Sequence, residues 1–182
     1  LFDRYNLKYE YTVLLPKTIA GEFLKAHGHI HYAKTCPEKS IMEIMEVIHG
    51  KGYFLLFLPR ESGCDVTLVE TKPGDRFIVP KQYYHLTINI GDEPFIFSDI
   101  ISTVSAGDYS LLKEKKGAPI YVFKDKAGGI RYEWNKNYPP VESLTLCDVN
   151  SLPYEQPFTI DGPLYDSFIS NPDKFKILAE PY

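Results

Sequence analysis

The chain has 182 residues, of which 44% are hydrophobic and 14% aromatic, so it can form one domain with a substantial core and is not disordered. The formal net charge is −4 and the basic residues are scattered, which argues against a nucleic-acid partner. No apolar run approaches the roughly 20 residues of a membrane span. No signal peptide is evident and the three cysteines have no paired spacing, so we expect a cytoplasmic protein with reduced thiols.

Short segments rich in β-branched and aromatic residues, separated by turns, run through the first two thirds of the chain. Besides the histidine-rich stretch 26–31, they fall at residues 9–15, 41–48, 53–58, 64–70, 76–79, 84–90, 95–101, 120–123 and 129–134. About ten strands at intervals of roughly 8–12 residues indicate an all-β antiparallel sandwich or barrel. Gly50-Lys51-Gly52 predicts a tight turn that pairs its two flanking segments as a hairpin, whereas residues 32–40 show no alternation and predict a loop.

The character of the sequence changes at Tyr138, where prolines become frequent. Apolar residues at 164, 165, 168 and 169 predict one short helix, which ends before Asn171-Pro172. We therefore expect a barrel over residues 1–137 and a C-terminal extension over residues 138–182 that packs on the barrel or on a partner subunit.

Histidines occupy alternate positions in the stretch 26–31. Side chains two residues apart on a strand point to the same face, so His29 and His31 converge. With Glu43 and His85 from neighbouring strands, they can hold one divalent metal ion and leave positions open for a substrate. A nitrogen-rich set with one carboxylate suits iron, manganese, nickel or zinc better than calcium or magnesium.

Other candidate groups have simpler explanations. Glu46 points to the opposite face of the strand that carries Glu43. His27 either faces inward, where it could donate to a phosphate, or is exposed to solvent, and His49 beside a turn is expected on the surface. Cys36 has no histidine partner at a recognisable spacing, so a role as nucleophile is not supported.

Longer motifs carry a family resemblance. Residues 73–80 (PGDRFIVP) and 89–97 (NIGDEPFIF), with His85 between them and the segment 28–31 (GHIH) upstream, resemble the cupin-type glucose-6-phosphate isomerases of archaea and bacteria. The resemblance spans residues 12–134. It implies a cupin double-stranded β-helix, which is a jelly-roll barrel and commonly a homodimer with a divalent metal ion in each subunit. It also implies the interconversion of glucose 6-phosphate and fructose 6-phosphate in glycolysis and gluconeogenesis.

The resemblance implies roles for individual residues. His29, His31, Glu43 and His85 match the metal ligands, and Glu43 also matches the carboxylate that shuttles a proton between C1 and C2 of the sugar. A metal-assisted hydride shift needs the same ligands, so the sequence leaves both routes open.

Three further positions match groups that bind the substrate. Thr12 and the backbone around Gly28 match phosphate-binding groups. Tyr109 matches a tyrosine that closes over the substrate, although an aromatic residue at the barrel rim explains it equally well. A phosphorylated sugar is therefore the expected small-molecule partner.

The chain departs from the family pattern at four places. Ala26 stands where a threonine is usual, Met45 replaces a tyrosine, Gln82 replaces another polar aromatic residue, and the segment between His31 and Glu43 is a few residues longer. These departures keep two alternatives open: an isomerase acting on another sugar phosphate, and a non-catalytic cupin that binds metal or sugar. Glu43 discriminates between enzyme and binding module, because binding alone needs no carboxylate in a proton-transfer position.

Overall fold

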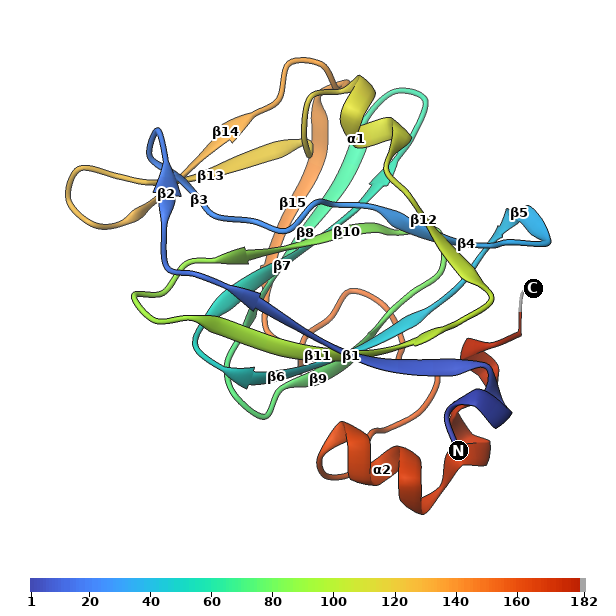
Figure 1. Cartoon of the computed structure of the whole chain (residues 1–182). Helices are drawn as coiled ribbons and strands as arrows, with labels where there is room; N and C mark the ends of the chain where they lie inside the picture. The colour runs from blue at the N-terminus through green and yellow to red at the C-terminus, as the bar shows by residue number, and fades with distance from the viewer. Residues whose placement is uncertain (181–182) are drawn as a thin grey trace.

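The computed structural model describes residues 1–180, and the side chains of all of these except Val141 and Glu142. Residues 181 and 182 of the expected C-terminal extension lie outside the described residues. Two four-stranded sheets face each other across a shared core, as Figure 1 shows. This arrangement confirms the predicted all-β, jelly-roll type of barrel.

The first sheet is antiparallel and has the strand order β1-β11-β6-β9. Its strands are β1 (Leu7–Leu14), β6 (Glu43–His49), β9 (Arg76–Val79) and β11 (Phe95–Ser102). Alternate side chains of these strands point into the barrel, for example Met45 and Val47 of β6 and Phe95 and Phe97 of β11.

The second sheet has the order β10-β7-β8-β15. Its strands are β7 (Gly52–Pro59), β8 (Cys64–Thr71), β10 (Tyr84–Asn89) and β15 (Val141–Cys147). Strands β10, β7 and β8 are antiparallel, whereas β15 joins the edge of the sheet parallel to β8. The sequence did not predict β15, because an edge strand needs only backbone partners and shows little apolar alternation.

The predicted hairpin around Gly50-Lys51-Gly52 is wrong. The turn is present, but β6 and β7 belong to different sheets, so it carries the chain across the barrel. Gly50 has a φ of +79°, which a residue with a side chain rarely adopts. A Cβ on Gly52 would lie 2.3 Å from the ring of Phe95. The glycines therefore permit a close crossing between the sheets rather than a two-stranded ribbon.

Two smaller sheets complete the barrel. The third has the order β12-β4-β5 and consists of β4 (Ile30–Ala33), β5 (Cys36–Ser40) and β12 (Ser105–Asp108). The predicted loop at residues 32–40 is therefore wrong, since most of it pairs through backbone hydrogen bonds that do not depend on side-chain alternation. The fourth has the order β14-β13-β3-β2, with strands β2 (Thr18–Ile19), β3 (Glu22–Phe23), β13 (Ile120–Lys124) and β14 (Ile130–Trp134).

Both barrel sheets are covered on their outer faces. The fourth sheet and the short helix α1 (Ser110–Glu114) pack on β7, β8 and β10. The 3₁₀ helix η1 (Asp3–Tyr5), the predicted helix α2 (Leu164–Ser170) and the 3₁₀ helix η2 (Pro172–Leu178) cover the first sheet, where Figure 1 shows α2 below β6 and β9. None of the described helices has both the length and the apolar character to cross a membrane.

Candidate metal centre

The segment that precedes β4 lies antiparallel to β10, and this pairing sets the positions of the histidines. The backbone N–H of His29 donates to the carbonyl of His85 at 3.0 Å, and the N–H of His85 donates back at 2.9 Å. His31 follows two residues later on β4 and therefore points to the same side as His29. Glu43 begins β6 and reaches the same point from the first sheet.

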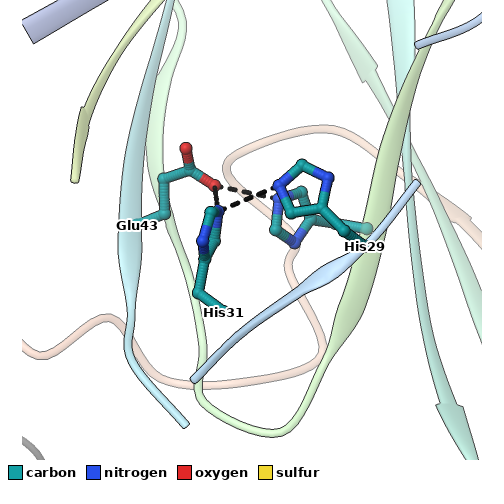
Figure 2. A group of neighbouring side chains, drawn as sticks. His29, His31 and Glu43 are labelled. Atoms are coloured by element: carbon teal, nitrogen blue, oxygen red, sulfur yellow. Dashed lines mark hydrogen bonds and ion pairs between the residues drawn. The ribbon is translucent and has the colours of Figure 1, made fainter. Parts of the chain in front are cut away.

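Four side chains converge there. One ligand atom each from His29, His31, Glu43 and His85 lies within 4.8 Å of all the others. The Nε2 atoms of His29 and His31 are 3.0 Å apart, and Oε2 of Glu43 lies 3.1 Å from Nε2 of His31 and 2.9 Å from Nε2 of His85. Figure 2 shows the labelled side chains of His29, His31 and Glu43 pointing toward one another. The geometry is therefore that of four donors around one point.

The protonation state of His29 and an unpartnered nitrogen of His85 favour a cation at this point. Nδ1 of His29 donates to the carbonyl oxygen of His27 at 3.0 Å, which leaves the lone pair of Nε2 directed at the cluster. Burial, together with the neighbouring His85 and His31, lowers the pKa of His29 to about 4, so this imidazole stays neutral at pH 7. Nε2 of His85 is buried and makes no aligned hydrogen bond, although a carboxylate oxygen is 2.9 Å away. A metal ion would satisfy these nitrogen atoms.

Glu43 is only 6% exposed. Burial raises the pKa of Glu43, but the adjacent His31, its hydrogen bond to the carboxylate and the adjacent His85 outweigh it and hold the pKa well below its usual value. The side chain is therefore an ionised carboxylate, as a metal ligand or proton acceptor must be. Glu46, three residues along β6, points to the opposite face and pairs with Arg76 at 2.7 Å.

The cluster lies in the wall of a cavity of about 400 Å³, which is within the range of small-molecule sites. Thr12 and Tyr109, the expected substrate-binding residues, also line this cavity. The ring of Tyr109 lies 4.6 Å from that of His27 and 5.0 Å from that of His29, measured between ring centroids. His27 is exposed at the cavity, and Ala26 lines it as well.

Gly28 is buried between these histidines. A Cβ there would lie 2.5 Å from the side chain of Leu112 and 2.9 Å from that of Leu86, so the close approach of α1 and β10 requires glycine. The other candidates lie apart from the cluster. His49 is exposed, and its Nε2 atom lies 3.3 Å from Oε2 of Glu93. The thiol of Cys36 donates a hydrogen bond to Oε1 of Glu38 at 2.7 Å.

Comparison with known proteins agrees with this geometry. The family model for glucose-6-phosphate isomerase (GPI) matches residues 2–141. The chain belongs to this family. The glucose-6-phosphate isomerase of Pyrococcus furiosus is 33% identical over 117 residues, which are 64% of this chain and 58% of the relative. That of Thermococcus kodakarensis is 36% identical over 120 residues, which are 66% of this chain and 59% of the relative.

The matched part of the chain thus spans less than two thirds of the length of these curated relatives. A solved structure of an uncharacterized conserved protein with a double-stranded β-helix domain, from Klebsiella pneumoniae, is also similar. It is 18% identical, with a TM-score of 0.40 over 57% of this chain and 75% of the other.

Sequence reasoning missed three ionisable residues of the cavity, of which Asp99 on β11 is the most buried. It is 6% exposed. Burial, with the charges of Glu43 and Glu10 close by, raises the pKa of Asp99 to about 9. A signal existed, because Phe95, Phe97 and Ile101 share the inward face of this strand and an acid there interrupts an apolar row. Lys8 and Glu10, both at the cavity and ion-paired with each other, were also missed.

Proposed function

We propose that the chain is a metal-dependent isomerase that interconverts glucose 6-phosphate and fructose 6-phosphate. The observation that carries this proposal is the convergence of three imidazoles and one carboxylate in the wall of a substrate-sized cavity, in a member of this family. No basic cluster is needed, since hydroxyl and backbone N–H groups can hold a phosphate.

His29, His31, Glu43 and His85 would hold one divalent ion of iron, manganese, nickel or zinc. Such an ion, when bound, polarises the sugar oxygens and makes the hydrogen on the adjacent carbon more acidic. The buried Nε2 atom of His85, which has no hydrogen-bond partner, supports this assignment, because buried polar atoms are otherwise nearly always hydrogen-bonded.

Glu43 would carry the proton. It takes the proton from C2 of the open-chain aldose and returns it to C1, while the hydroxyl proton passes from O2 to O1 and the carbonyl group moves from C1 to C2. The low pKa of Glu43 and its position at the cavity support this role, since a base must be ionised and within reach of the carbon.

The remaining cavity residues would bind the rest of the substrate. Thr12 and the backbone around Gly28 hold the phosphate, and Tyr109 covers the sugar. The cavity-lining positions of Thr12 and Tyr109 support these roles. A second candidate substrate, another sugar phosphate, is favoured by Ala26 and Met45, because both departures from the family pattern also line the cavity.

The proposal includes a homodimer in the cytoplasm. The three cysteines are free thiols, as in a reducing compartment. Strand β1 forms an edge of the first sheet and exposes Tyr11 and Val13, with Leu15 exposed just beyond it, an apolar row that a second subunit could cover. Sedimentation velocity of the wild type against Val13→Lys tests the dimer, which the substitution should weaken.

The function is tested by stripping the purified protein of metal with a chelator, reloading it with each of the four metals, and following glucose 6-phosphate formed from fructose 6-phosphate. We expect turnover with at least one metal and none in the stripped protein. Absence of turnover with every metal would refute the proposal. The reaction of glucose 6-phosphate in deuterium oxide then tests the route, because proton transfer through Glu43 incorporates deuterium at C1 of the fructose 6-phosphate formed and a hydride shift does not.

A further inference from the structure

Buried polar atoms without a hydrogen-bond partner gather at the cavity. Among the described residues, most of these atoms belong to His31, His85, Thr87 and Asp99, and all four residues line the cavity. The Nε2 atom of His85 has an explanation in the metal centre, because it is one of the nitrogen atoms that converge there. Oδ1 of Asp99 has none, because Asp99 is not among the residues whose ligand atoms form the cluster.

Asp99 lies in surroundings that make a carboxyl group costly. Across the first sheet it pairs with Glu10 of β1 and with Met45 of β6, and Phe97 precedes it on the same face of β11. It is 94% buried, and an unsatisfied buried polar group destabilises the fold. A residue with no role beyond packing would be apolar at this position, as Phe95, Phe97 and Ile101 are.

Asn89, at the other end of the barrel interior, is a buried polar residue with a purely structural role and can be compared with Asp99. It is fully buried, and its amide nitrogen donates to the carbonyls of Leu14 and Glu93 at 2.8 Å each. Its side-chain oxygen accepts from the N–H of Gly91 at 2.9 Å. Asn89 is thus fully hydrogen-bonded within the chain, whereas Asp99 has an oxygen left over that borders the cavity.

The position and the charges around Asp99 limit which group of a substrate this oxygen could bind. Asp99 pairs across the sheet with Met45, which is two residues from Glu43 on the same face of β6, and the charge of Glu43 contributes to the raised pKa of Asp99. Asp99 therefore lies beside the carbon atoms on which Glu43 would act. Glu10 lies directly opposite on β1 and lines the same cavity, and Lys8 beside it is already ion-paired with Glu10. Two carboxyl groups with no spare cation beside them disfavour a phosphate group at this wall. Thr12, the expected phosphate contact, lies two residues further along β1, at a distance of about 7 Å along the strand. The partner of Asp99 is therefore an uncharged polar group of the substrate, which in a sugar is a hydroxyl.

We propose that Asp99 is a specificity-determining residue that hydrogen-bonds to the sugar hydroxyl on C3, next to the two reacting carbons. This inference rests on the proposed function, since the reacting carbons are identified by the isomerase reaction. A site built to hydrogen-bond a substrate hydroxyl rejects analogues in which that hydroxyl is absent or points elsewhere. Asp99 would therefore select the configuration at C3.

The test compares fructose 6-phosphate with psicose 6-phosphate, which differs only in the configuration at C3, in the wild type, Asp99→Asn and Asp99→Ala. We expect the wild type to favour fructose 6-phosphate. Asp99→Ala should lower kcat/KM for fructose 6-phosphate by about 10- to 100-fold and leave that for psicose 6-phosphate within about twofold, so the preference collapses. Asp99→Asn, which retains a hydrogen-bonding side chain of the same shape, should keep part of the preference.

Ser98→Ala is the matched control. Ser98 precedes Asp99 on β11 and is buried on the opposite face of the sheet. It pairs with Glu46 of β6 and does not line the cavity. It should leave the ratio of the two kcat/KM values unchanged. Equal losses on both sugars in Asp99→Ala would overturn the inference, as would a loss of bound metal measured by elemental analysis, because either outcome would make Asp99 a general support of the metal centre.

Calorimetric binding of glucitol 6-phosphate, an open-chain polyol that cannot isomerise, separates this inference from the proposed function. Suppose that the metal-loaded protein binds this polyol, that Asp99→Ala weakens the binding at least tenfold, and that neither sugar is turned over. This result would refute the isomerase function and leave the assignment of Asp99 intact. Binding unaffected by Asp99→Ala would refute the assignment of Asp99. Neither turnover nor binding would refute both.

Discussion

The two ends of the barrel interior are built from the same strands but filled with different side chains. At one end, Phe54, Phe77, Phe95 and Phe97 pack edge-to-face or tilted, with ring centroids 5.0–5.9 Å apart. At the other end, imidazoles and carboxyl groups surround a cavity, and several of their buried atoms lack partners. One end is close-packed and apolar, and the other is polar and incompletely satisfied.

The division runs along individual strands rather than between parts of the chain. Strand β6 contributes Glu43 to the polar end and Val47 to the apolar end, and β11 contributes Asp99 and Phe95 in the same way. Four positions along one strand therefore separate a residue of the polar cavity from a residue of the apolar core. Stability and activity should therefore respond to different substitutions, even within one strand.

The largest expected effect is on activity, from Glu43→Gln. The amide has nearly the same shape but cannot take up a proton, so kcat should fall about 1,000-fold or more. The metal-free protein should lose some stability, because the contacts that lower the pKa of Glu43 also stabilise the fold, but it should remain folded at the assay temperature. Initial-rate kinetics and thermal unfolding measure the two quantities. Wild-type kcat in this variant would show that Glu43 does not carry the proton.

The largest expected effect on stability comes from Phe54→Ala at the apolar end. Phe54 is fully buried and contacts the rings of Phe77, Phe95 and Phe97, so its truncation leaves a cavity and should cost about 3–5 kcal/mol of unfolding free energy. Urea unfolding measures the loss. The activity per folded molecule should stay near the wild-type value, and a parallel loss of kcat in fully folded protein would break the proposed division between the two ends.

Local patterns in the sequence were sufficient for most strands and for the cluster. The period-two spacing of His29 and His31 gave the correct facing, because strand geometry fixes side-chain direction over a few residues. The alternation along 41–48 also separated Glu43 from Glu46 correctly, although Glu43 is the first residue of β6. Helix α2 was also predicted, because its apolar spacing and the following Asn-Pro are local signals.

The features that depend on long-range pairing were not predicted. The turn at Gly50 has the same sequence signal whether it closes a hairpin or crosses between sheets. The outcome depends on distant strands, because β6 pairs with β9 and β11 and β7 pairs with β10. Strands β5 and β15 are stabilised by backbone pairing to neighbours, which leaves little trace in their side chains. Asp99 escaped because its significance depends on Glu10 and Glu43, which are far from it in sequence.

Glu46→Gln tests whether the two faces of β6 differ in function, since it makes the same chemical change as Glu43→Gln three residues further along the strand. One carboxylate oxygen of Glu46 accepts from Nε of Arg76 at 2.7 Å, and the other accepts from the N–H of Leu164 at the start of α2 at 3.0 Å. Loss of the charge leaves Arg76 poorly compensated and should destabilise the protein by about 2 kcal/mol. The value of kcat should not change, and a fall in kcat comparable to that of Glu43→Gln would contradict the separation of the two faces.

The smallest effect concerns a titratable group on the packed side, Cys64, which is fully buried beneath the fourth sheet. Burial raises the pKa of Cys64 to about 12, whereas an unfolded thiol ionises near pH 8.5. Above about pH 8.5 the unfolded chain loses a proton that the folded chain keeps, so stability falls as pH rises toward 12. Between pH 7.5 and 9.5 the wild type should lose about 1 kcal/mol more than Cys64→Ala, which cannot ionise there. Urea unfolding of both proteins at the two pH values isolates this difference, because the tyrosines contribute equally to both. An equal fall in the unfolding free energy of both proteins would mean that burial does not keep the thiol protonated. The value of kcat should be unchanged in Cys64→Ala, because Cys64 does not line the cavity.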